Sequence, residues 1–351
     1  MRVSLPPLGP TPPPATPGQR LAGDLRDTHG RVITDLRLSV TDRCNFRCIY
    51  CLEPDVRFLP KQELLHREEY LRIITACRNL GVRTLRLTGG EPTLYPELDD
   101  LIADIGRLEL DDVAMTTNGW ALDADRARDW RRAGLRRLTF SLDTLREDRM
   151  REITRSRTTV AAVLKAVATA REAGFPRPKV NMVVMRGTND DEVADFASLA
   201  RQEDLDIRFI EFMPLDSARE WGRQVVFTAD ETRAAIESRW PLEPLDEPNP
   251  HSTSVNWRFA DDAPGKLGFI APVSRPFCGA CNRLRITAEG KIRPCLFSHD
   301  EWDLKPLLRR NEPMARLEHF LIDAAWNKQP GHGIGQDGFQ QPERSMSAIG
   351  G

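Results

Sequence analysis

CNFRCIYC, the stretch from Cys44 to Cys51, places three cysteines at the spacing C-x3-C-x2-C. A structural zinc site takes four protein ligands, and a four-iron cluster is usually held by four cysteines. The next histidine is His66, so no fourth ligand stands nearby. Cys44, Cys48 and Cys51 therefore predict either a partial zinc site or a four-iron cluster whose open iron binds a small molecule.

A second group of three cysteines, Cys278, Cys281 and Cys295, has the spacing C-x2-C-x13-C. His299 follows four residues later, and on their own these four side chains are typical of a closed zinc site. Two separate triads, each short of a fourth cysteine, favour iron–sulfur clusters instead. If His299 does not ligate, the second cluster also has an open iron that could bind substrate directly.

The composition limits the classes of protein to which the chain can belong. Its 351 residues are enough for one large domain and a smaller one, and its net charge of −2 indicates neither a nucleic acid nor a membrane partner. Seven cysteines, two triads and Cys77, indicate metal ligation in a reducing compartment rather than a disulfide framework. Cys77 occupies an apolar position of a predicted helix and is interpreted as a core residue.

The sequence does not predict membrane insertion or secretion. No apolar run reaches transmembrane length, and the segment MRVSLPPLGPTPPPATPGQR lacks the apolar centre of a secretory signal. Residues 1–30 form a proline-rich leader that we expect to be disordered. The predicted localisation is therefore cytoplasmic.

From residue 31 to residue 245, a β-branched or apolar run is repeatedly followed by a charged segment with helical period. Six such βα units predict an α/β fold with a parallel sheet and helices outside, and six rather than eight indicate an incomplete (βα)6 barrel of the TIM type. A doubly wound open sheet is the alternative, which periodicity does not separate. The predicted strands are Ile33–Val40, Arg83–Thr88, Val113–Thr117, Arg137–Leu142, Lys179–Met185 and Ile207–Phe212. The predicted helices include Arg67–Leu80, Asp123–Ala133, Val160–Ala173, Asp190–Arg201 and Ala229–Ser238.

The unusual polar motifs all follow predicted strands. The first cysteine triad follows the first strand, and later strands end in TGGEP (Thr88–Pro92), TTNG (Thr116–Gly119), SLD (Ser141–Asp143) and EFMP (Glu211–Pro214). The need of tight turns for Gly, Asn and Asp explains part of this pattern. Because the carboxyl ends of parallel strands carry the site in such folds, the motifs predict one site at that end of the barrel.

The chain changes character near residue 246, where Pro, Asn and Ser become frequent. Residues 246–330 are predicted to form a small α+β module that carries the second triad and contacts the substrate. Residues 331–351 are polar and Gly-rich and end in Gly350 and Gly351, so we expect a flexible tail. The predicted elements of the module are Val255–Phe259, Leu267–Ala271, Arg283–Thr287, Lys291–Pro294 and the helix Pro313–Trp326.

Strand alternation places several cations inside the predicted barrel. In RTLRLT, Arg86 shares a face with Thr84 and Thr88, while Leu85 and Leu87 suit packing against helices. An unpaired buried cation is costly, and Arg binds phosphate through a bidentate fork. A local carboxylate partner is the simpler explanation for any one cation, whereas six together predict a phosphate-bearing ligand. The inward cations are Arg37, Arg86, Lys179, Arg208, Arg283 and Arg285.

With these motifs in order, the chain resembles the GTP 3′,8-cyclase family, a family of radical S-adenosylmethionine (SAM) enzymes in molybdenum cofactor biosynthesis. The resemblance rests on CNFRCIYC, LRLTGGEP, TTNG, SLD, IEFMP, CGACNRLR, Cys295 and the terminal Gly-Gly, and it runs from Arg37 to Gly351. It implies two [4Fe-4S] clusters, one on each triad. SAM would bind the open iron of the first cluster, and the guanine ring of the substrate would bind that of the second.

The resemblance also implies which residues contact SAM and GTP. In the family the Gly-Gly tail reaches into the active site, where a glycine backbone can approach closely. The chain departs from the family at Thr84, where the family commonly has Lys, and we expect weaker triphosphate binding. SAM would contact Gly90, Ser141, Met213 and the backbone of Tyr50. GTP would contact Arg37, Arg86, Thr117, Lys179, Arg208, Arg283 and Arg285.

The implied reaction is a radical cyclisation. SAM cleavage by the reduced first cluster gives a 5′-deoxyadenosyl radical, which takes the ribose C3′ hydrogen of GTP; the C3′ radical then adds to guanine C8, giving 3′,8-cyclo-7,8-dihydro-GTP. The implied partners are an electron donor and the pterin synthase that consumes the product, and a homodimer is left open. The alternatives are a radical SAM maturase that modifies peptides and, less supported by the net charge, a non-enzymatic zinc protein that binds nucleic acid.

Overall fold

The computed structural model describes residues 24–216, 219, 221–246 and 249–350. Within these residues the strands form one twelve-stranded sheet in the order β12-β11-β10-β1-β2-β3-β4-β5-β6-β9-β8-β7. Neighbouring strands from β10 to β9 are parallel, and the pairs beyond each end are antiparallel. The first six strands are β1 (Asp35–Ser39), β2 (Thr84–Thr88), β3 (Asp112–Thr117), β4 (Arg137–Ser141), β5 (Lys179–Val184) and β6 (Asp206–Glu211).

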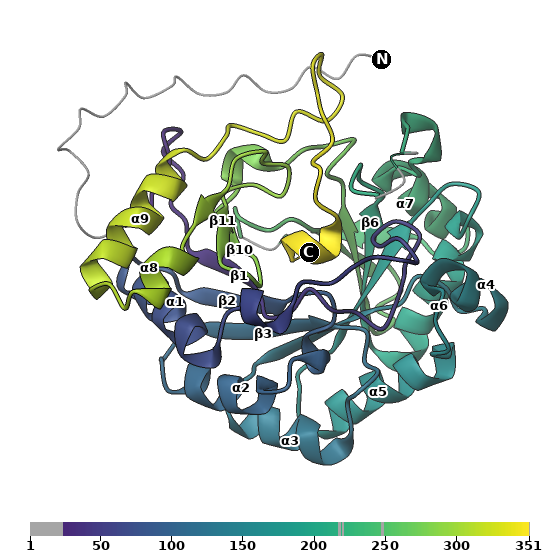
Figure 1. Cartoon of the computed structure of the whole chain (residues 1–351). Coiled ribbons are helices and arrows are strands. Elements are labelled where there is room, and N and C mark those ends of the chain that lie inside the picture. The colour runs from purple at the N-terminus through teal and green to yellow at the C-terminus, as the bar shows by residue number, and fades with distance from the viewer. Residues whose placement is uncertain (1–23, 217–218, 220, 247–248, 351) are drawn as a thin grey trace.

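Helices cover the outside of this sheet, and the strands curve around a central opening (Figure 1). The order β1 to β6 follows the chain without reversal, whereas a doubly wound sheet reverses at its switch point. The predicted incomplete barrel is therefore confirmed, and the doubly wound alternative is wrong. The helices of this part are α1 (Arg67–Asn79), α2 (Leu98–Gly106), α3 (Ala124–Arg132), α4 (Glu147–Thr154), α5 (Val160–Glu172), α6 (Val193–Glu203) and α7 (Ala229–Glu237).

Alternation along β2 divides its side chains as the sequence predicts. Leu85 and Leu87 are 1% and 0% exposed and belong to the core between sheet and helices. Arg86, between them, faces the other way and lines the central cavity. Burial of each leucine stabilises the fold by roughly 1.5–3 kcal/mol, and a shift of one residue in register would expose both. The apolar face of β2 therefore fixes the inward direction of Arg86.

Two helices of this part, α2 and α4, are absent from the sequence prediction. Helix α2 has nine residues and buries Leu101, Ile102 and Ile105 among others. Helix α4 has eight residues, most of them polar, and buries Met150 and Ile153. Segments of about two turns contain too few repeats for a helical period to stand out.

The segment after α7 extends the barrel sheet at both of its edges. Strand β9 pairs with β6, and β10 pairs with β1, both in parallel. The main-chain groups that β1 and β6 would otherwise leave unpaired are thereby satisfied. The remaining elements are β7 (Leu242–Pro244), β8 (Val255–Phe259), β9 (Lys266–Ile270), β10 (Arg283–Ile286), β11 (Lys291–Arg293), β12 (Trp302–Asp303), α8 (Lys305–Arg309), α9 (Met314–Trp326) and α10 (Met346–Ile349).

The end of the predicted leader is part of the folded barrel. Residues 1–23 lie outside the described residues, but Leu25 is fully buried and its backbone N–H donates to the carbonyl of Leu80. Asp27 accepts hydrogen bonds from the backbone of His29 and from Arg31. The predicted disorder is therefore wrong for residues 24–30, where one apolar side chain and one bound carboxylate attach the segment.

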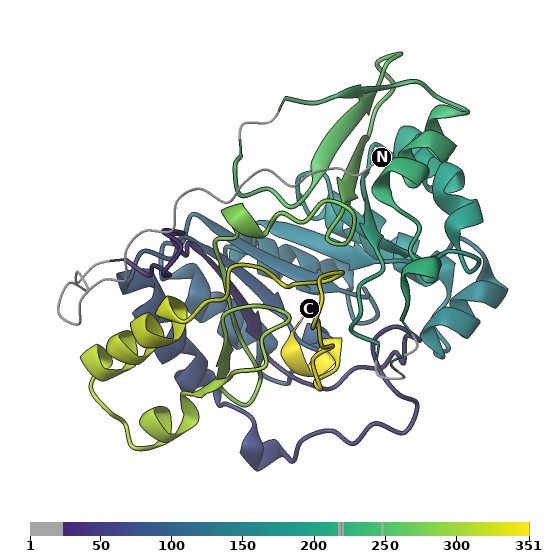
Figure 2. The ribbon, with the colours of Figure 1, turned by 90° about the horizontal axis from the view of Figure 1, so that it is seen from above.

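The C-terminal segment returns to the barrel instead of leaving it. Its last helix, α10, lies over the centre of the ring of strands in Figure 1 and at one end of the barrel in Figure 2. Ile349 is fully buried and packs with Leu215, Phe297 and Ile334. The sequence suggested a flexible tail for 331–351, whereas Ile334, Phe339, Met346 and Ile349 of this segment pack in one apolar cluster and residues 335–338 between them are exposed. Gly351 lies outside the described residues.

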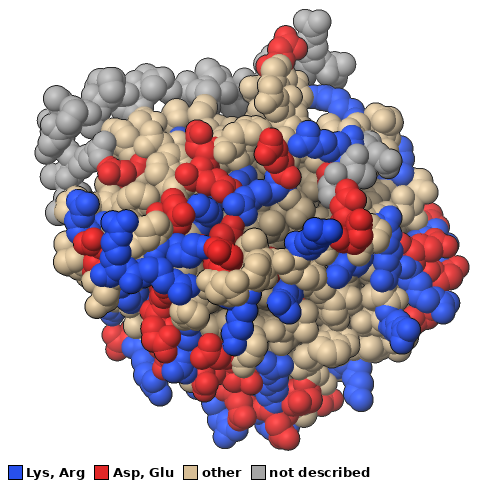
Figure 3. Space-filling model, viewed as in Figure 1, with Lys and Arg blue, Asp and Glu red and all other residues tan. Residues whose placement is uncertain are grey.

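The surface mixes both signs of charge. Lysine and arginine alternate with aspartate and glutamate over the face shown in Figure 3, as the near-zero net charge suggests. None of the described helices is both long and apolar enough to span a bilayer. All seven cysteines are free thiols, and Cys77 is fully buried in the core, as predicted.

Candidate functional site

One cavity opens at the carboxyl ends of the parallel strands, where the motifs predicted a site. Its wall includes Thr88 at the end of β2, Thr117 at the end of β3 and Ser141 at the end of β4. All six cysteines of the two triads line the same cavity. The triads therefore lie across a shared space, although more than 220 residues of chain separate them.

The first triad lies on the loop that leaves β1. The backbone N–H of Cys51 donates to the Cys48 carbonyl at 2.8 Å, which folds the loop into a turn. Burial raises the pKa of Cys44 to about 11 and that of Cys51 to about 12. In the metal-free chain these thiols stay protonated at neutral pH, so metal binding must displace their protons.

The second triad is surrounded by cations. Burial alone would raise the pKa of Cys281, but the charges of Arg283, Lys328 and Arg31 lower it to about 6. Lys328 donates from Nζ to the Arg283 carbonyl at 2.8 Å, and Arg31 donates to the Cys278 carbonyl at 2.8 Å. These fixed positive charges stabilise thiolates and suit an anionic metal–sulfur group.

The metal-free protein should therefore show one unusually reactive thiol. We expect alkylation of Cys281 by iodoacetamide to rise around pH 6, because the thiolate is the nucleophile and the pKa of Cys281 is about 6. Cys44 and Cys51 should react slowly until the pH approaches 11. Peptide mapping by mass spectrometry across a pH series measures all three rates. Equal rates at pH 7 would show that the surrounding cations do not act on Cys281.

Among the residues that the structure describes, no group of three His, Cys, Asp or Glu side chains is arranged to hold a single metal ion. A zinc ion is bound by side chains that converge on one point, whereas each thiolate of a four-iron cluster binds a different iron.

His299, which the sequence left open as a fourth ligand, is absent from the cavity wall. Its Nε2 lies 3.3 Å from the Gln340 carbonyl on the surface. A different histidine, His332, lines the cavity and accepts the Ile334 N–H at Nδ1; its ring centroid lies 5.5 Å from that of Phe297, with the two rings tilted at 57°. His332 was not predicted, because a single histidine in a Gly-rich segment does not by itself indicate a site.

The loop after β2 packs directly on the loop of the first triad. A Cβ atom on Gly90 would lie 2.3 Å from the Arg43 carbonyl, so only glycine fits there. Gly90, Ser141, Met213 and Tyr50, the predicted SAM contacts, all line the cavity. The structure thus brings these four positions together beside the first triad.

Two buried carboxylates of the cavity wall were not singled out by the sequence. Glu91 accepts hydrogen bonds from Thr93, from the Thr117 hydroxyl at 2.6 Å and from the Asn118 N–H at 2.7 Å. Asp143 accepts from the Tyr50 hydroxyl at 2.7 Å, and burial raises its pKa to about 6. Glu91, which follows β2, thus binds the end of β3. The Thr117 hydroxyl, a predicted GTP contact, already donates its hydrogen bond to the Glu91 carboxylate.

Five of the predicted inward cations line the cavity: Arg37, Arg86, Arg208, Arg283 and Arg285. The Nε atoms of Arg37, Arg86 and Arg283 are buried without a hydrogen-bond partner. Burial and repulsion from Arg37 lower the pKa of Arg86, and the same two effects lower that of Arg285 to about 9. Such a cluster is costly in the empty protein and is best compensated by an anion.

The simpler explanation, a local carboxylate partner, applies to only part of this set. Lys179, the sixth predicted cation, donates to Asp206 at 2.8 Å and is not part of the cavity wall. Arg37 lies 3.6 Å from Asp35. Within the described part of the chain, Arg86 instead donates hydrogen bonds only to the hydroxyls of Thr116 and Thr139, both at 3.2 Å. Arg86 is therefore the clearest candidate for binding an external anion.

The described end of the tail contacts this cluster. The Gly350 carbonyl accepts from Arg285 Nη1 at 2.8 Å. A Cβ atom at Gly350 would lie 2.8 Å from Ser39 Cβ and 3.0 Å from Thr88 Oγ1, and its φ is +83°. Glycine is required at this position by both the close approach and the left-handed backbone.

Curated relatives with the same motifs cover nearly the full chain. A protein named GTP 3′,8-cyclase from Corynebacterium glutamicum is 41% identical over 350 residues, covering 97% of this chain and 91% of the relative. A Streptomyces coelicolor protein of the same name is 42% identical over 93% of this chain and 96% of its own length. This chain belongs to the GTP 3′,8-cyclase family. A Pseudomonas aeruginosa protein named GTP 3′,8-cyclase 2 is 45% identical over 93% of this chain and 98% of its own length.

The family assignment agrees with the two parts of the fold. Residues 38–200 match the radical SAM superfamily, and residues 205–334 match the family described as Molybdenum Cofactor Synthesis C. The structure of Streptococcus suis SuiB bound to S-adenosylmethionine shares the fold, with a TM-score of 0.60 and 14% identity over 87% of this chain and 66% of that one. The predicted class of GTP 3′,8-cyclase, a radical SAM enzyme with SAM and an iron–sulfur cluster, is confirmed.

Proposed function

We propose that this chain converts GTP into 3′,8-cyclo-7,8-dihydro-GTP, the first step of molybdopterin biosynthesis. The observation that carries the proposal is one cavity, which both cysteine triads line together with five arginines that are partly or fully buried. A radical generator, a second metal group and a polyanion site are the parts that a nucleotide cyclase of this family needs.

The two triads are suited to different tasks within that cavity. Cys44, Cys48 and Cys51 would hold the cluster that binds SAM, and Cys278, Cys281 and Cys295 would hold a second cluster beside the purine. When bound, SAM and the first cluster supply the radical that removes the ribose C3′ hydrogen. Gly90, Ser141, Met213 and the Tyr50 backbone would orient SAM.

The arginines would bind the triphosphate. Arg86 and Arg37 are partly buried, their Nε atoms lack a hydrogen-bond partner, and the fork of each can donate two hydrogen bonds to phosphate oxygens. Arg208, Arg283 and Arg285 line the same cavity. Lys179 and Thr117 remain proposed contacts, although each already donates a hydrogen bond to a carboxylate. Binding of GTP would neutralise the cluster and stabilise the loaded protein.

Apolar side chains would keep water away from the radical. Phe46, Met213, Phe297 and Met346 line the cavity near the two triads. Water exclusion limits side reactions of a reactive intermediate. The proposed partners are an external electron donor and a pterin synthase that receives the product. The proposed location is the cytoplasm, whose reducing conditions keep thiols free. A homodimer is left open.

The deciding experiment is an anaerobic assay of the reconstituted chain with GTP, SAM and a reductant. We expect 5′-deoxyadenosine, a product with the mass of the cyclised nucleotide, and about eight irons per chain if both triads hold four-iron clusters. Colourless protein with stoichiometric zinc, or 5′-deoxyadenosine without a nucleotide product, would reject the proposal.

Arg285→Ala should separate the nucleotide reaction from SAM cleavage. Arg285 is buried and donates to the Gly350 carbonyl on the nucleotide side of the cavity, so its loss should disturb GTP and the tail more than SAM. We expect turnover of GTP to fall about 100-fold, as for the loss of a charged hydrogen bond or two, with uncoupled SAM cleavage changed far less. Equal loss of both activities would assign Arg285 a purely structural role.

A further inference from the structure

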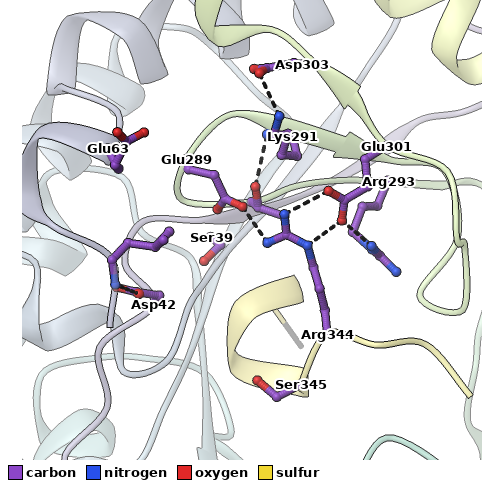
Figure 4. A network of polar contacts seen from close by, with 12 residues as sticks. Ser39, Asp42, Glu63, Glu289, Lys291, Arg293, Glu301, Asp303, Arg344 and Ser345 are labelled. Atoms are coloured by element: carbon purple, nitrogen blue, oxygen red, sulfur yellow. Dashed lines mark hydrogen bonds and ion pairs between the residues drawn. The ribbon is translucent and has the colours of Figure 1, made fainter. Parts of the chain in front are cut away.

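The tail (residues 331–350) is attached to the rest of the protein by a network of charged side chains that are not among the residues lining the cavity. Arg344 donates from Nη1 to Glu289 at 2.5 Å and from Nη2 to Glu301 at 2.8 Å, while its Nε lies 2.5 Å from the same Glu301. Figure 4 shows the Arg344 guanidinium between the two carboxylates, with Arg293 bound to Glu301 from the other side. We call these four residues, Arg293, Arg344, Glu289 and Glu301, the clasp.

The clasp is balanced and only partly exposed. Two guanidinium groups face two carboxylates, and the side chains of Glu289 and Arg293 are 8% and 3% exposed. Burial alone would lower the pKa of Arg344, but Glu289 and Glu301 raise it. Bidentate pairing at such burial holds a side chain more firmly than an exposed ion pair does.

The clasp joins the tail to the segment that carries the second triad. Glu289 lies in the turn between β10 and β11, and Glu301 directly precedes β12. Cys295 lies on the same stretch, between these two glutamates in sequence. Arg344 is therefore bound by the segment from β10 to β12, which also carries Cys295.

The residues that follow Arg344 reach the opposite triad. Ser347 is buried and lines the cavity together with Met346 and Cys51. Three residues later, the Gly350 carbonyl accepts from Arg285. A short, buried run of chain therefore spans the space between Cys51 and the arginine cluster, and its start is fixed by Arg344.

We propose that Arg344 is a positioning residue, which fixes the last residues of the tail against the first triad and the arginine cluster. Arg344 contacts neither SAM nor nucleotide in this scheme; it acts through Ser347 and Gly350. Loss of the clasp would leave SAM cleavage intact while the radical is less well directed to the nucleotide. This second part of the inference rests on the proposed function, whereas the anchoring of the tail does not.

Two substitutions and their combination test the anchoring. Amide hydrogen exchange of residues 345–350, followed by mass spectrometry on the reconstituted full chain, should rise about tenfold in Arg344→Gln and in Glu289→Gln. The double variant should exchange no faster than Arg344→Gln alone, because both changes break the same pair. Arg344→Lys keeps the charge but not the bidentate fork, so it should give an intermediate rate.

The matched control is Arg239→Gln, which breaks an exposed ion pair to Asp195 on the outer helices and should leave tail exchange unchanged. In Arg344→Gln, the ratio of 5′-deoxyadenosine to cyclised product should rise about tenfold, with the KM for SAM unchanged. Unchanged tail exchange in Arg344→Gln would overturn the anchoring, and faster exchange with an unchanged ratio would overturn the positioning role. If the unmodified chain makes no cyclised product, the proposed function fails, while the exchange data still decide the anchoring.

Discussion

Cys51→Ala should abolish formation of 5′-deoxyadenosine, whereas Cys281→Ala should retain it and lose only the cyclised nucleotide. Each variant should also lose about four of about eight irons, because each removes a ligand from one triad. The two products then report on the two triads separately. We expect the loss in the first variant to exceed 1,000-fold, roughly the effect of removing the group that starts the reaction.

The different surroundings of the two triads are the reason for this contrast. Cys51 lines the cavity together with Gly90 and Ser141, the proposed SAM contacts, and its pKa is raised to about 12 by burial. Cys281 lies among Arg283, Lys328 and Arg31, on the side of the arginine cluster. A missing ligand on that side should disturb the nucleotide and leave SAM in place.

Cys77→Ala is the matched control, because it removes a buried thiol outside both triads. Its iron content and both products should match those of the unmodified chain, with a loss of about 1 kcal/mol in the free energy of unfolding. Loss of 5′-deoxyadenosine in Cys281→Ala as complete as in Cys51→Ala would contradict separate tasks for the triads.

Arg86→Met should make the nucleotide-free protein more stable and its binding of GTP about 100-fold weaker, a change of ~2.7 kcal/mol. Arg86 is partly buried and is repelled by Arg37; among the described residues it donates hydrogen bonds only to the hydroxyls of Thr116 and Thr139. Methionine fills a similar volume without the charge, so we expect a gain of about 1 kcal/mol in the free energy of unfolding. The same change would remove a proposed bidentate partner of the triphosphate.

Arg137→Met provides the comparison on β4, which is separated from β2 by β3. Arg137 is bound by Asp112, and this hydrogen bond raises its pKa. Its replacement leaves Asp112 without its cation and should lower the free energy of unfolding. Denaturant unfolding without nucleotide, and calorimetric titration with GTP under anaerobic conditions, measure the two quantities. If Arg86→Met is destabilised as much as Arg137→Met, the arginine cluster is not a strained anion site.

Much of the barrel follows from local patterns in the sequence. The apolar residues Leu85 and Leu87 alternate with Arg86, so the direction of each side chain is readable from the strand alone. The cysteine triads are readable because few other roles explain such spacing. For these features, local spacing and the known geometry of strands are sufficient.

The features that the sequence did not predict depend on contacts between distant segments. Nothing near β10 indicates that it pairs with β1, and nothing near Arg344 indicates Glu289 as its partner. Glu91 and Asp143 were visible in their motifs, but their hydrogen-bond partners come from other strands. Leu25 was hidden by the proline-rich composition of the preceding residues.

The parallel pairing of β1 with β10 has a consequence for synthesis. On the ribosome, β1 emerges near the start of the chain, and its outer partner β10 emerges only after most of the remaining residues have been translated. Until then the nascent barrel exposes an open strand edge, which is a template for aggregation. We therefore expect the newborn polypeptide to depend on chaperones, and truncation before β10 to yield inclusion bodies rather than a smaller working barrel.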